Sequence, residues 1–450
     1  MTSSGETRLF GGLFAHGEVA GLVSDRAFAD AMIEVEVALL GALAELGLAP
    51  EEAARELAEA VDAGLELDVS ELGRGTGEQG TPIPALLRAL RRQLPESVSA
   101  HLHKGATSQD VIDTAMMLVA ARALDVIVAD LDDAADACAA LAQEGRDAIV
   151  PGRTLLQQAL PVTFGLKAAA WLASLDGVRA DVAGVRDREL AVQFGGAVGT
   201  LASLGDRGLD VAAGMARRLG LAVPDGPWHT VRLRPARLAA ACGITLGVLG
   251  KIGRDVVLLA QTEVAEVVEG GGEGRGGSST MPHKRNPVGG IGLVACAERA
   301  PGLVATMLGA MTQEHERGAG GWQAEWETLL ELLRLTGSAA AIARELLAGL
   351  EPDPGKMRED MYLTGGLVMS ESVSAALAPS LGRARAQALV ERVARRAVDG
   401  NRSFREVLRE DPAVDDALGE EGISSALDPA GYLGVSSELI DRALARHRAG

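Results

Sequence analysis

The chain has 450 residues and a formal net charge of −19 at pH 7; 47% of its residues are hydrophobic and 3% are aromatic. A chain of this length buries a sizeable core and usually divides into two or three domains. Because binding to nucleic acid depends on clustered Lys and Arg, the acidic balance argues against a nucleic-acid partner. Few aromatic residues beside abundant Ala, Leu, Val and Gly favour closely packed helices over sandwiched strands.

The three cysteines, Cys138, Cys242 and Cys296, are far apart and lie in apolar sequence that reads as helix. Their spacing fits neither a disulfide framework nor a metal site, so we expect buried thiols in a reducing compartment. The N-terminal segment lacks the basic start and apolar run of a signal peptide, and no uninterrupted apolar stretch is long enough to span a membrane. We therefore predict a cytoplasmic protein without a membrane partner.

The first 106 residues read as short helices separated by turns, with glycine-rich turn signals between residues 73 and 80. From residue 107 to about residue 146, apolar and small residues recur at helical spacing, which predicts a helix roughly 55–60 Å long. Thr107 or Ser108 is its expected N-cap, with Asp110 in the first turn. The polar run GATSQD (residues 105–110) is thus placed at a helix N-terminus, where backbone N–H groups favour an anion.

Further helices are expected over residues 151–188, 235–269, 288–311 and 325–350, and strand-like alternation is nowhere sustained. The helix over 235–269 carries Gly243, Gly247, Gly250 and Gly253 on one face, each costing about 1 kcal/mol of helix propensity relative to Ala. Close approach of neighbouring helices in a bundle explains such a run.

Two prolines near residue 350 mark a break, after which shorter amphipathic helices follow. The sequence predicts an all-α fold with three domains. These are an N-terminal helical domain over residues 1–106, a central long-helix bundle over 107–350 and a small C-terminal helical domain over 351–450.

The segment GGGEGRGGSSTMPHKRNPV (residues 270–288) follows the second long helix, and six of its first eight residues are glycine. Such a backbone can approach a ligand closely. It is not a phosphate-binding loop, because no G-K-[ST] ends it. It is not a dinucleotide-binding turn either, because a helix rather than a strand precedes it.

This segment resembles the signature loop of the aspartase/fumarase superfamily, G-S-S-x-M-P-x-K-x-N-P. The fixed positions are matched by Gly277, Ser278, Ser279, Met281, Pro282, Lys284, Asn286 and Pro287. HKGATSQDVIDT (residues 103–114) and GRTLLQQALPVTFG (residues 152–165) resemble the first and second conserved regions of the same superfamily. The resemblance implies an L-aspartase-like fold and a homotetramer in which the long helices form a twenty-helix core. Each active site would combine the three regions from three subunits.

Flanking segments suggest the subfamily: VQFGGAVGTLASLG (192–205), PWHT (227–230), QTEVAEV (261–267), QEHERGAGGWQAEWETL (313–329) and PAGYLG (429–434). Together with the loop, they resemble bacterial 3-carboxy-cis,cis-muconate cycloisomerases of protocatechuate breakdown in the β-ketoadipate pathway. The resemblance implies an intramolecular lyase that acts on a small polycarboxylate and needs neither metal nor cofactor. The sequence itself contains no His, Cys and carboxylate cluster with metal-ligand spacing.

The resemblance also assigns residue roles. Ser278 matches the catalytic acid or base, and Lys284 with Asn286 matches the pair that stabilises the aci-carboxylate formed beside the reacting carbon. The expected substrate-binding residues are His103, Thr107, Ser108, Gln109, Gln158, Thr163, Ser279, Met281 and Arg317. Arg317 can equally form a surface salt bridge. Loop positioning is the favoured role for His283, and His229 of PWHT is a weaker candidate.

One departure from the superfamily bears on the substrate. Leu155 stands where amine-releasing members carry His, and the nearby Gln158 cannot titrate. An amine leaving group needs a proton donor, whereas a carboxylate leaves unaided. This disfavours adenylosuccinate or argininosuccinate cleavage. It leaves open a β-elimination lyase that releases fumarate from another substituted succinate, such as nitrosuccinate. A catalytically silent homologue is a further alternative, but it predicts a damaged loop, and Ser278, Lys284 and Asn286 are intact.

Overall fold

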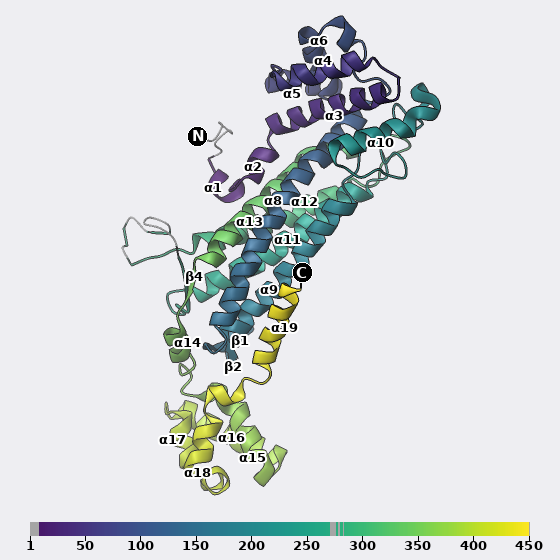
Figure 1. Ribbon diagram of the computed structural model, residues 1–450. Helices are drawn as coiled ribbons and strands as arrows, with labels where there is room; N and C mark the ends of the chain where they lie inside the picture. Colours follow the sequence, from purple (N-terminus) through teal and green to yellow (C-terminus); the bar gives the residue numbers. More distant parts are fainter. Residues whose placement is uncertain (1–8, 271–275, 278–279, 282, 450) are drawn as a thin grey trace. The chain divides into compact units, whose positions relative to one another are not determined.

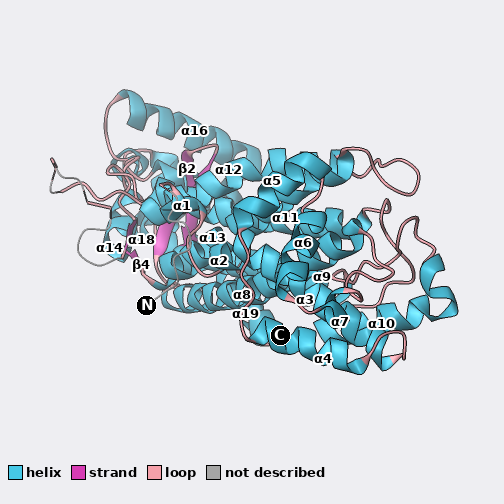
Figure 2. Ribbon diagram, turned by 90° about the horizontal axis from the view of Figure 1, so that it is seen from above, coloured by secondary structure: helices cyan, strands magenta, loops and turns pink. Residues whose placement is uncertain are grey.

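The computed structural model describes residues 9–270, 276–277, 280–281 and 283–449. The chain divides into two compact units. Unit 1 is Met1–Leu131, Gly177–Lys251 and Gly292–Ala343; unit 2 is Asp132–Asp176, Ile252–Ile291 and Arg344–Gly450. The boundary between them falls inside five long helices: α8 (Ser108–Glu144), α9 (Phe164–Arg188), α11 (Leu233–Leu259), α12 (Val288–Gly309) and α13 (Gly321–Ala348). The expectation of an all-α fold with long helices is confirmed (Figures 1 and 2). The proposed boundaries of the three domains, near residues 106 and 350, stay a prediction.

Unit 1 begins with short helices around α3, which packs against α4 and α10 (Figure 1). The Ser24 side chain starts α3 by accepting a hydrogen bond from Ala27 N at 3.2 Å, as an N-cap does. The elements are α1 (Gly11–Phe14), α2 (Val19–Leu22), α3 (Asp25–Glu45), α4 (Glu51–Asp62), α5 (Val69–Gln79), α6 (Ile83–Gln93), α7 (Glu96–Ser99), η1 (Ala202–Arg207) and α10 (Gly208–Leu219).

The glycines that predicted a turn over residues 73–80 lie mostly inside a helix. Helix α5 continues to Gln79, and only Gly80, with φ 70°, ends it in a left-handed C-cap. The expected turn was therefore wrong for residues 73–79. Packing explains one of these glycines, because a Cβ added at Gly75 would lie 2.5 Å from the Cβ of Ala85 in α6.

Unit 2 contains a β-hairpin where the sequence predicted the start of a helix. Strand β1 (Ile149–Thr154) pairs antiparallel with β2 (Gln157–Thr163), and Pro151 lies opposite Pro161. The β-branched residues that flank the prolines favour strands, and a proline inside a helix removes a backbone donor. The predicted helix over 151–188 therefore begins only at Phe164, where Thr163 Oγ1 accepts a hydrogen bond from Leu166 N at 3.1 Å.

Helix α11 ends at Leu259, ten residues before its predicted end at 269. The remaining residues include β3 (Val267–Glu269), which pairs antiparallel with β4 (Leu350–Pro352). The expected reason for the glycines of α11 is confirmed at two positions in unit 1. A Cβ added at Gly243 would lie 2.6 Å from Val304 in α12, and one added at Gly250 would overlap Ala297 of the same helix.

The C-terminal part of unit 2 has its own apolar core, which includes Phe404, Val393 and Leu377. Its elements are α14 (Pro354–Asp360), η2 (Leu367–Met369), α15 (Ser370–Leu381), α16 (Arg383–Asp399), α17 (Phe404–Arg409), α18 (Pro412–Ala426) and η3 (Pro429–Tyr432). Helix α19 (Ser436–Arg448) follows, and its His447 lies between two carboxylates, with Nδ1 3.0 Å from Asp176 and Nε2 2.8 Å from Asp136.

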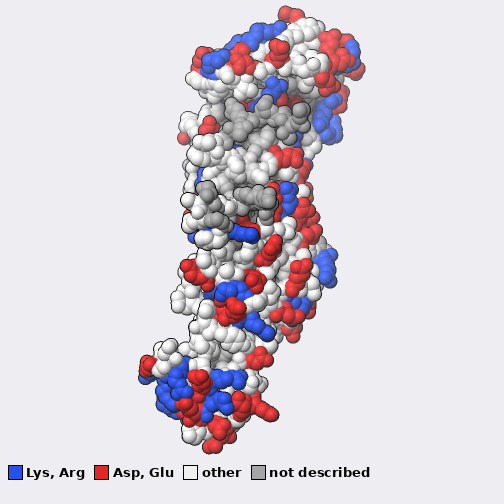
Figure 3. Space-filling model, turned by 90° about the vertical axis from the view of Figure 1, so that its left-hand side faces the viewer, with Lys and Arg blue, Asp and Glu red and all other residues white. Residues whose placement is uncertain are grey.

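All three cysteines are buried and unpaired, as expected. Burial raises the pKa of the Cys242 thiol to about 11, which makes it a poor nucleophile. On the face drawn in Figure 3, Lys and Arg side chains are interspersed with acidic ones. Among the described residues one helix, α12, is long and apolar enough to cross a membrane by length and composition, a test that core helices of soluble proteins also pass.

Candidate active site

The first candidate region surrounds the N-terminus of α8 in unit 1. The helix begins at Ser108, which makes Thr107 its N-cap, and Thr107 N donates to Asp110 Oδ2 at 3.0 Å. The Asp110 carboxylate also accepts hydrogen bonds from Gly195 N and Gly196 N, each at 2.9 Å. The GATSQD run is therefore fixed against the backbone of the segment around residue 195.

Arg317 lies beside this helix N-terminus. Its Nη1 is 3.3 Å from Thr107 Oγ1, and its Nη2 donates to Ala197 O at 2.8 Å. The side chain is half-buried, and among the described residues no carboxylate lies within salt-bridge distance of it. The surface salt bridge considered for Arg317 is thus not formed with any described residue, and its role as a carboxylate-binding residue stays a prediction. A half-buried guanidinium without its own carboxylate is suited to bind one from a ligand.

Two other candidates in unit 1 form hydrogen bonds or close polar contacts within the protein. Gln109 is fully buried, and its Nε2 donates to His229 O at 2.8 Å and to Asp113 Oδ2 at 3.2 Å. Its predicted contact with substrate finds no support in this geometry, because the side chain has no exposed surface. His103, with φ 61°, places Nδ1 2.7 Å from the buried Glu36 carboxylate. Ser108 is half-buried in the first turn of α8.

A buried ionic cluster lies behind this region. Arg232 is bound by Asp113, with Nη1 to Oδ2 2.7 Å, and by Glu325, with Nη2 to Oε2 2.6 Å. Burial raises the pKa of the Glu325 carboxyl, and Arg232 opposes this shift. Trp322 Nε1 also donates to Asp113, at 3.0 Å. The cluster links α8, the residue before α11 and the start of α13, and all three of its charged side chains are buried.

The second candidate region is the signature loop in unit 2. Asn286 closes the described part of the loop, because its backbone N and its Nδ2 both donate to Gly276 O, at 2.8 and 3.0 Å. Lys284 and Met281 are exposed. The Glu269 carboxylate accepts hydrogen bonds from Gly289 N at 2.9 Å and Gly290 N at 2.8 Å, so the strand before the loop is tied to the first turn of α12. The predicted Ser278 and Ser279, and Pro282 of the signature, lie outside the described residues.

The third candidate region is the β-hairpin of unit 2. Gln158 Nε2 donates to Asp360 O at 3.0 Å, and Thr163 is buried as the cap of α9. Both side chains therefore have structural partners in this chain. Leu155 and Leu156 form the tip with φ 52° and 64°, and Leu155 is 97% exposed. Two leucines in left-handed conformation are unusual, and the sequence did not predict a turn here.

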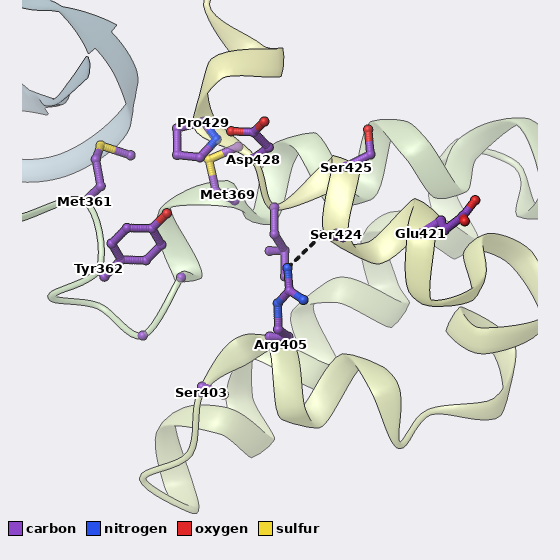
Figure 4. A pocket seen from close by; sticks show the side chains of 13 residues that line it. Met361, Tyr362, Met369, Ser403, Arg405, Glu421, Ser424, Ser425, Asp428 and Pro429 are labelled. Carbon is purple, nitrogen blue, oxygen red and sulfur yellow. Dashed lines mark hydrogen bonds between the residues drawn. The ribbon is translucent and has the colours of Figure 1, made fainter. Parts of the chain in front are cut away.

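The structure thus brings Thr107, Ser108 and Arg317 together in unit 1, and Met281, Lys284 and Asn286 in the loop of unit 2. From its sequence position Asp110 is expected only to start a helix, yet its carboxylate accepts hydrogen bonds from Thr107 N, Gly195 N and Gly196 N and so organises the first region. The sequence signal is that Asp110 stands three residues after the N-cap Thr107, where an acidic side chain can accept a hydrogen bond from the N-cap N–H. A cavity of about 960 Å³ lies elsewhere, in the C-terminal part of unit 2 between Tyr362, Met369 and Arg405 (Figure 4), and none of the predicted site residues lines it.

Comparison with known proteins identifies the family. A family model described as "Lyase" matches residues 15–302, and one described as "Adenylosuccinate lyase C-terminus" matches residues 366–443. The chain therefore belongs to this lyase family of the aspartase/fumarase superfamily, as its loop predicted.

The chain is similar over its whole length to relatives of two named activities. The chain is 45% identical to a 3-carboxy-cis,cis-muconate cycloisomerase of Pseudomonas aeruginosa, over 100% of this chain and 98% of the relative. It is 43% identical to a nitrosuccinate lyase of Streptomyces davaonensis, over 95% of this chain and 92% of the relative. The crystal structure of the 3-carboxy-cis,cis-muconate lactonizing enzyme from Pseudomonas putida superposes with a TM-score of 0.91 at 41% identity, over 98% of this chain and 99% of that one. The L-aspartase-like fold is confirmed by this similarity.

Proposed function

We propose that this protein converts 3-carboxy-cis,cis-muconate to 4-carboxymuconolactone in protocatechuate degradation. The observation that carries the proposal is the Arg317 guanidinium, which lies 3.3 Å from Thr107 Oγ1 at the N-terminus of α8 and has no carboxylate partner among the residues that the structure describes. A cation beside a helix N-terminus suits one carboxylate of a polycarboxylate substrate. The names of the full-length relatives support the choice of carboxymuconate.

The reaction is an internal addition. A carboxylate oxygen of the substrate forms a C–O bond to its own double bond, and the displaced electron pair collects on the carbon beside another carboxylate. Lys284 and Asn286 stabilise this aci-carboxylate, and electrostatic stabilisation of developing charge is usually the largest contribution to catalysis. Ser278 then donates its proton to the carbon and regains one from solvent. Nothing leaves the substrate, so the lactone retains all of its atoms.

A β-elimination lyase that acts on nitrosuccinate is the second candidate. The relative of that name supports it, and so does the exposed Leu155 at the hairpin tip, because an elimination that expels nitrite needs no titratable donor there. Adenylosuccinate cleavage is disfavoured by the same residue, as the sequence predicted.

One assay separates the two candidates. Purified protein is incubated with 3-carboxy-cis,cis-muconate while the loss of its ultraviolet absorbance is followed, and the lactone is identified by NMR. Release of fumarate from nitrosuccinate is measured in parallel. Turnover of carboxymuconate at least as efficient as that of nitrosuccinate is expected; turnover of nitrosuccinate alone would contradict the proposal.

We further propose that the enzyme is a cytoplasmic homotetramer whose active sites combine residues of several subunits. Large apolar side chains on two long helices support an assembly, since Ile244 is 56% exposed, Ile291 44% and Leu308 50%. The test mixes two variants of strongly reduced activity, Lys284→Ala and Arg317→Ala, after dissociation and reassembly. Partial recovery of activity is expected, because some sites receive the intact residue from each parent. No recovery in verified mixed oligomers would mean that one chain supplies both residues.

A further inference from the structure

We propose that Asp110 and His229 form a positioning pair that holds Arg317 in place to bind a substrate carboxylate. Neither residue is exposed enough to touch a ligand: Asp110 is 1% exposed and His229 4%. Their role is to fix the backbone groups that in turn bind the guanidinium. The inference rests on the proposed function and adds to it the residues that determine affinity for that carboxylate.

The Asp110 carboxylate binds four donors from three segments of unit 1. Oδ1 accepts from Gly195 N at 2.9 Å and lies 2.7 Å from His229 Nε2. Oδ2 accepts from Thr107 N at 3.0 Å and from Gly196 N at 2.9 Å. Two carboxylate oxygens offer about four acceptor positions, so the group is saturated. Because an ionised carboxylate can only accept, Nε2 of His229 carries the proton in this contact.

The same carboxylate fixes both sides of the Arg317 site. Arg317 Nη2 donates to Ala197 O at 2.8 Å and lies 3.4 Å from Gly196 O, and Nη1 lies 3.3 Å from Thr107 Oγ1. The N–H groups of Gly196 and Thr107 are both bound by Asp110. A closed ring of hydrogen bonds therefore runs from Asp110 through Thr107, Arg317 and Gly196 back to Asp110.

Local packing leaves this turn little freedom. Gly196 has φ 67°, and a Cβ added there would lie 2.9 Å from Gly105 O. A Cβ added at Gly195 would lie 2.7 Å from Cε1 of His229. The imidazole is therefore both a hydrogen-bond donor to Asp110 and a wall against which the glycine turn packs.

The segment that contains His229 also contacts the segment of Arg317 directly. Thr230 Oγ1 donates to His315 O at 2.9 Å, two residues before Arg317. Gln109 Nε2 donates to His229 O at 2.8 Å, which anchors this segment to α8. His229 thus connects the buried start of α8 with the partly exposed guanidinium, and loss of its Nε2–H should release the turn and Arg317 together.

The test compares two amide substitutions at one position. In His229→Gln the side-chain nitrogen takes the place of Nε2 and can donate to Asp110, whereas in His229→Asn it is too short to reach. We expect the Asn variant to raise KM for 3-carboxy-cis,cis-muconate by about tenfold or more with a smaller change in kcat, because a displacement of about 1 Å in a positioned group costs up to about 100-fold. The Gln variant should recover most of the loss. His447→Gln, which alters a His–Asp contact in unit 2, is the control and should leave KM unchanged.

A second measurement distinguishes a positioning role of His229 from a loss of folding or assembly. Circular dichroism and oligomer mass verify that each variant is folded. In an Arg317→Ala background, His229→Asn should raise KM little further, because the group that it positions is gone. Full additivity of the two effects on KM, or equal KM values for His229→Gln and His229→Asn, would overturn the proposal.

Failure of the proposed function gives a different result. Wild-type protein that turns over only nitrosuccinate contradicts the cycloisomerase, and the same variants are then compared by their KM for nitrosuccinate. Wild-type protein inactive on both contradicts the proposed function altogether. The comparison is then made by calorimetric binding of tricarballylate, and an unchanged affinity in His229→Asn would still overturn the positioning role.

Discussion

Arg153 forms a two-armed ion pair with Glu266: Nη1 lies 2.8 Å from Oε2, and Nη2 lies 2.6 Å from Oε1. Glu266 has no exposed surface, and Arg153 is 20% exposed. The pair joins the β-hairpin to the residue before strand β3, which leads into the glycine-rich loop. Two segments that the sequence singled out for their resemblance to the superfamily are thus held together by a buried charge pair.

Replacing only one partner of this pair should be costly. Arg153→Leu leaves the Glu266 carboxylate buried without a counter-charge, and we expect a loss of roughly 3 kcal/mol in the free energy of unfolding at pH 8. Burial already raises the pKa of Glu266, and removal of Arg153 raises it further. The loss should therefore shrink toward pH 5, where the carboxyl takes up a proton. Urea unfolding at both pH values measures it, and an equal loss at both would contradict this explanation.

Two glycines of one helix provide a matched pair. Gly75→Ala in α5 should destabilise the protein, because its Cβ would lie 2.5 Å from that of Ala85. Gly77→Ala, two residues on, meets nothing within 4 Å and should stabilise the helix by about 0.5–1 kcal/mol. Thermal unfolding of both variants tests the prediction. Equal shifts of Tm in the same direction would show that the contact with α6 is not decisive.

Ser278→Ala should lower kcat by about 100-fold or more while leaving the fold and oligomer intact, because a positioned proton donor typically contributes a factor of that size. The decay of carboxymuconate absorbance measures the rate. Thr280→Ala, in the same loop, is the control and should retain most of the activity. Wild-type turnover in Ser278→Ala would remove this serine from the mechanism.

His447 should make the stability of unit 2 depend on pH. Burial lowers the pKa of this imidazole, but the hydrogen bonds and charges of Asp176 and Asp136 outweigh it, and the pKa is raised. The contribution of the charged imidazole is complete below the ordinary pKa of about 6.5 and is lost as the pH rises through the raised value. The Tm difference between wild type and His447→Gln should accordingly be larger near pH 6 than near pH 9. A difference that does not change with pH would indicate that His447 stays neutral.

Helical periodicity was a reliable guide to the long helices. The predicted start of α8 at Thr107 or Ser108 agrees with the structure because two local signals coincide there, an N-cap residue and an acidic residue three positions later. The hairpin over residues 149–163 was missed, since its strands are short and its turn consists of two leucines rather than Asn or Gly. The prediction of a turn at Gly75 was wrong because this glycine makes room for Ala85 of α6, a contact that the sequence of α5 alone does not show.

In the candidate site, too, the residues of a continuous motif could be predicted, whereas contacts between segments far apart in the sequence could not. The loop signature pointed to Lys284 and Asn286 through adjacent residues alone. The contact of Arg317 with Thr107 joins residues 210 positions apart, so it depends on how α8 and the segment before α13 fold together. The four hydrogen bonds of Asp110 could not be predicted either. Three of its donors, Gly195 N, Gly196 N and His229 Nε2, lie more than 80 residues away in the sequence.

The hydrogen bonds of Glu269 affect how the glycine-rich segment over residues 270–288 can change during evolution. By binding Gly289 N and Gly290 N, its carboxylate joins the two stems of the glycine-rich segment through groups that are not among the proposed catalytic residues. In the proposed function the residues between the stems bind the acid and deliver the proton, so insertions, deletions or exchanges there would alter both steps while the helices keep their register. A lineage that retains these hydrogen bonds can explore new substrates by replacing one short stretch of chain.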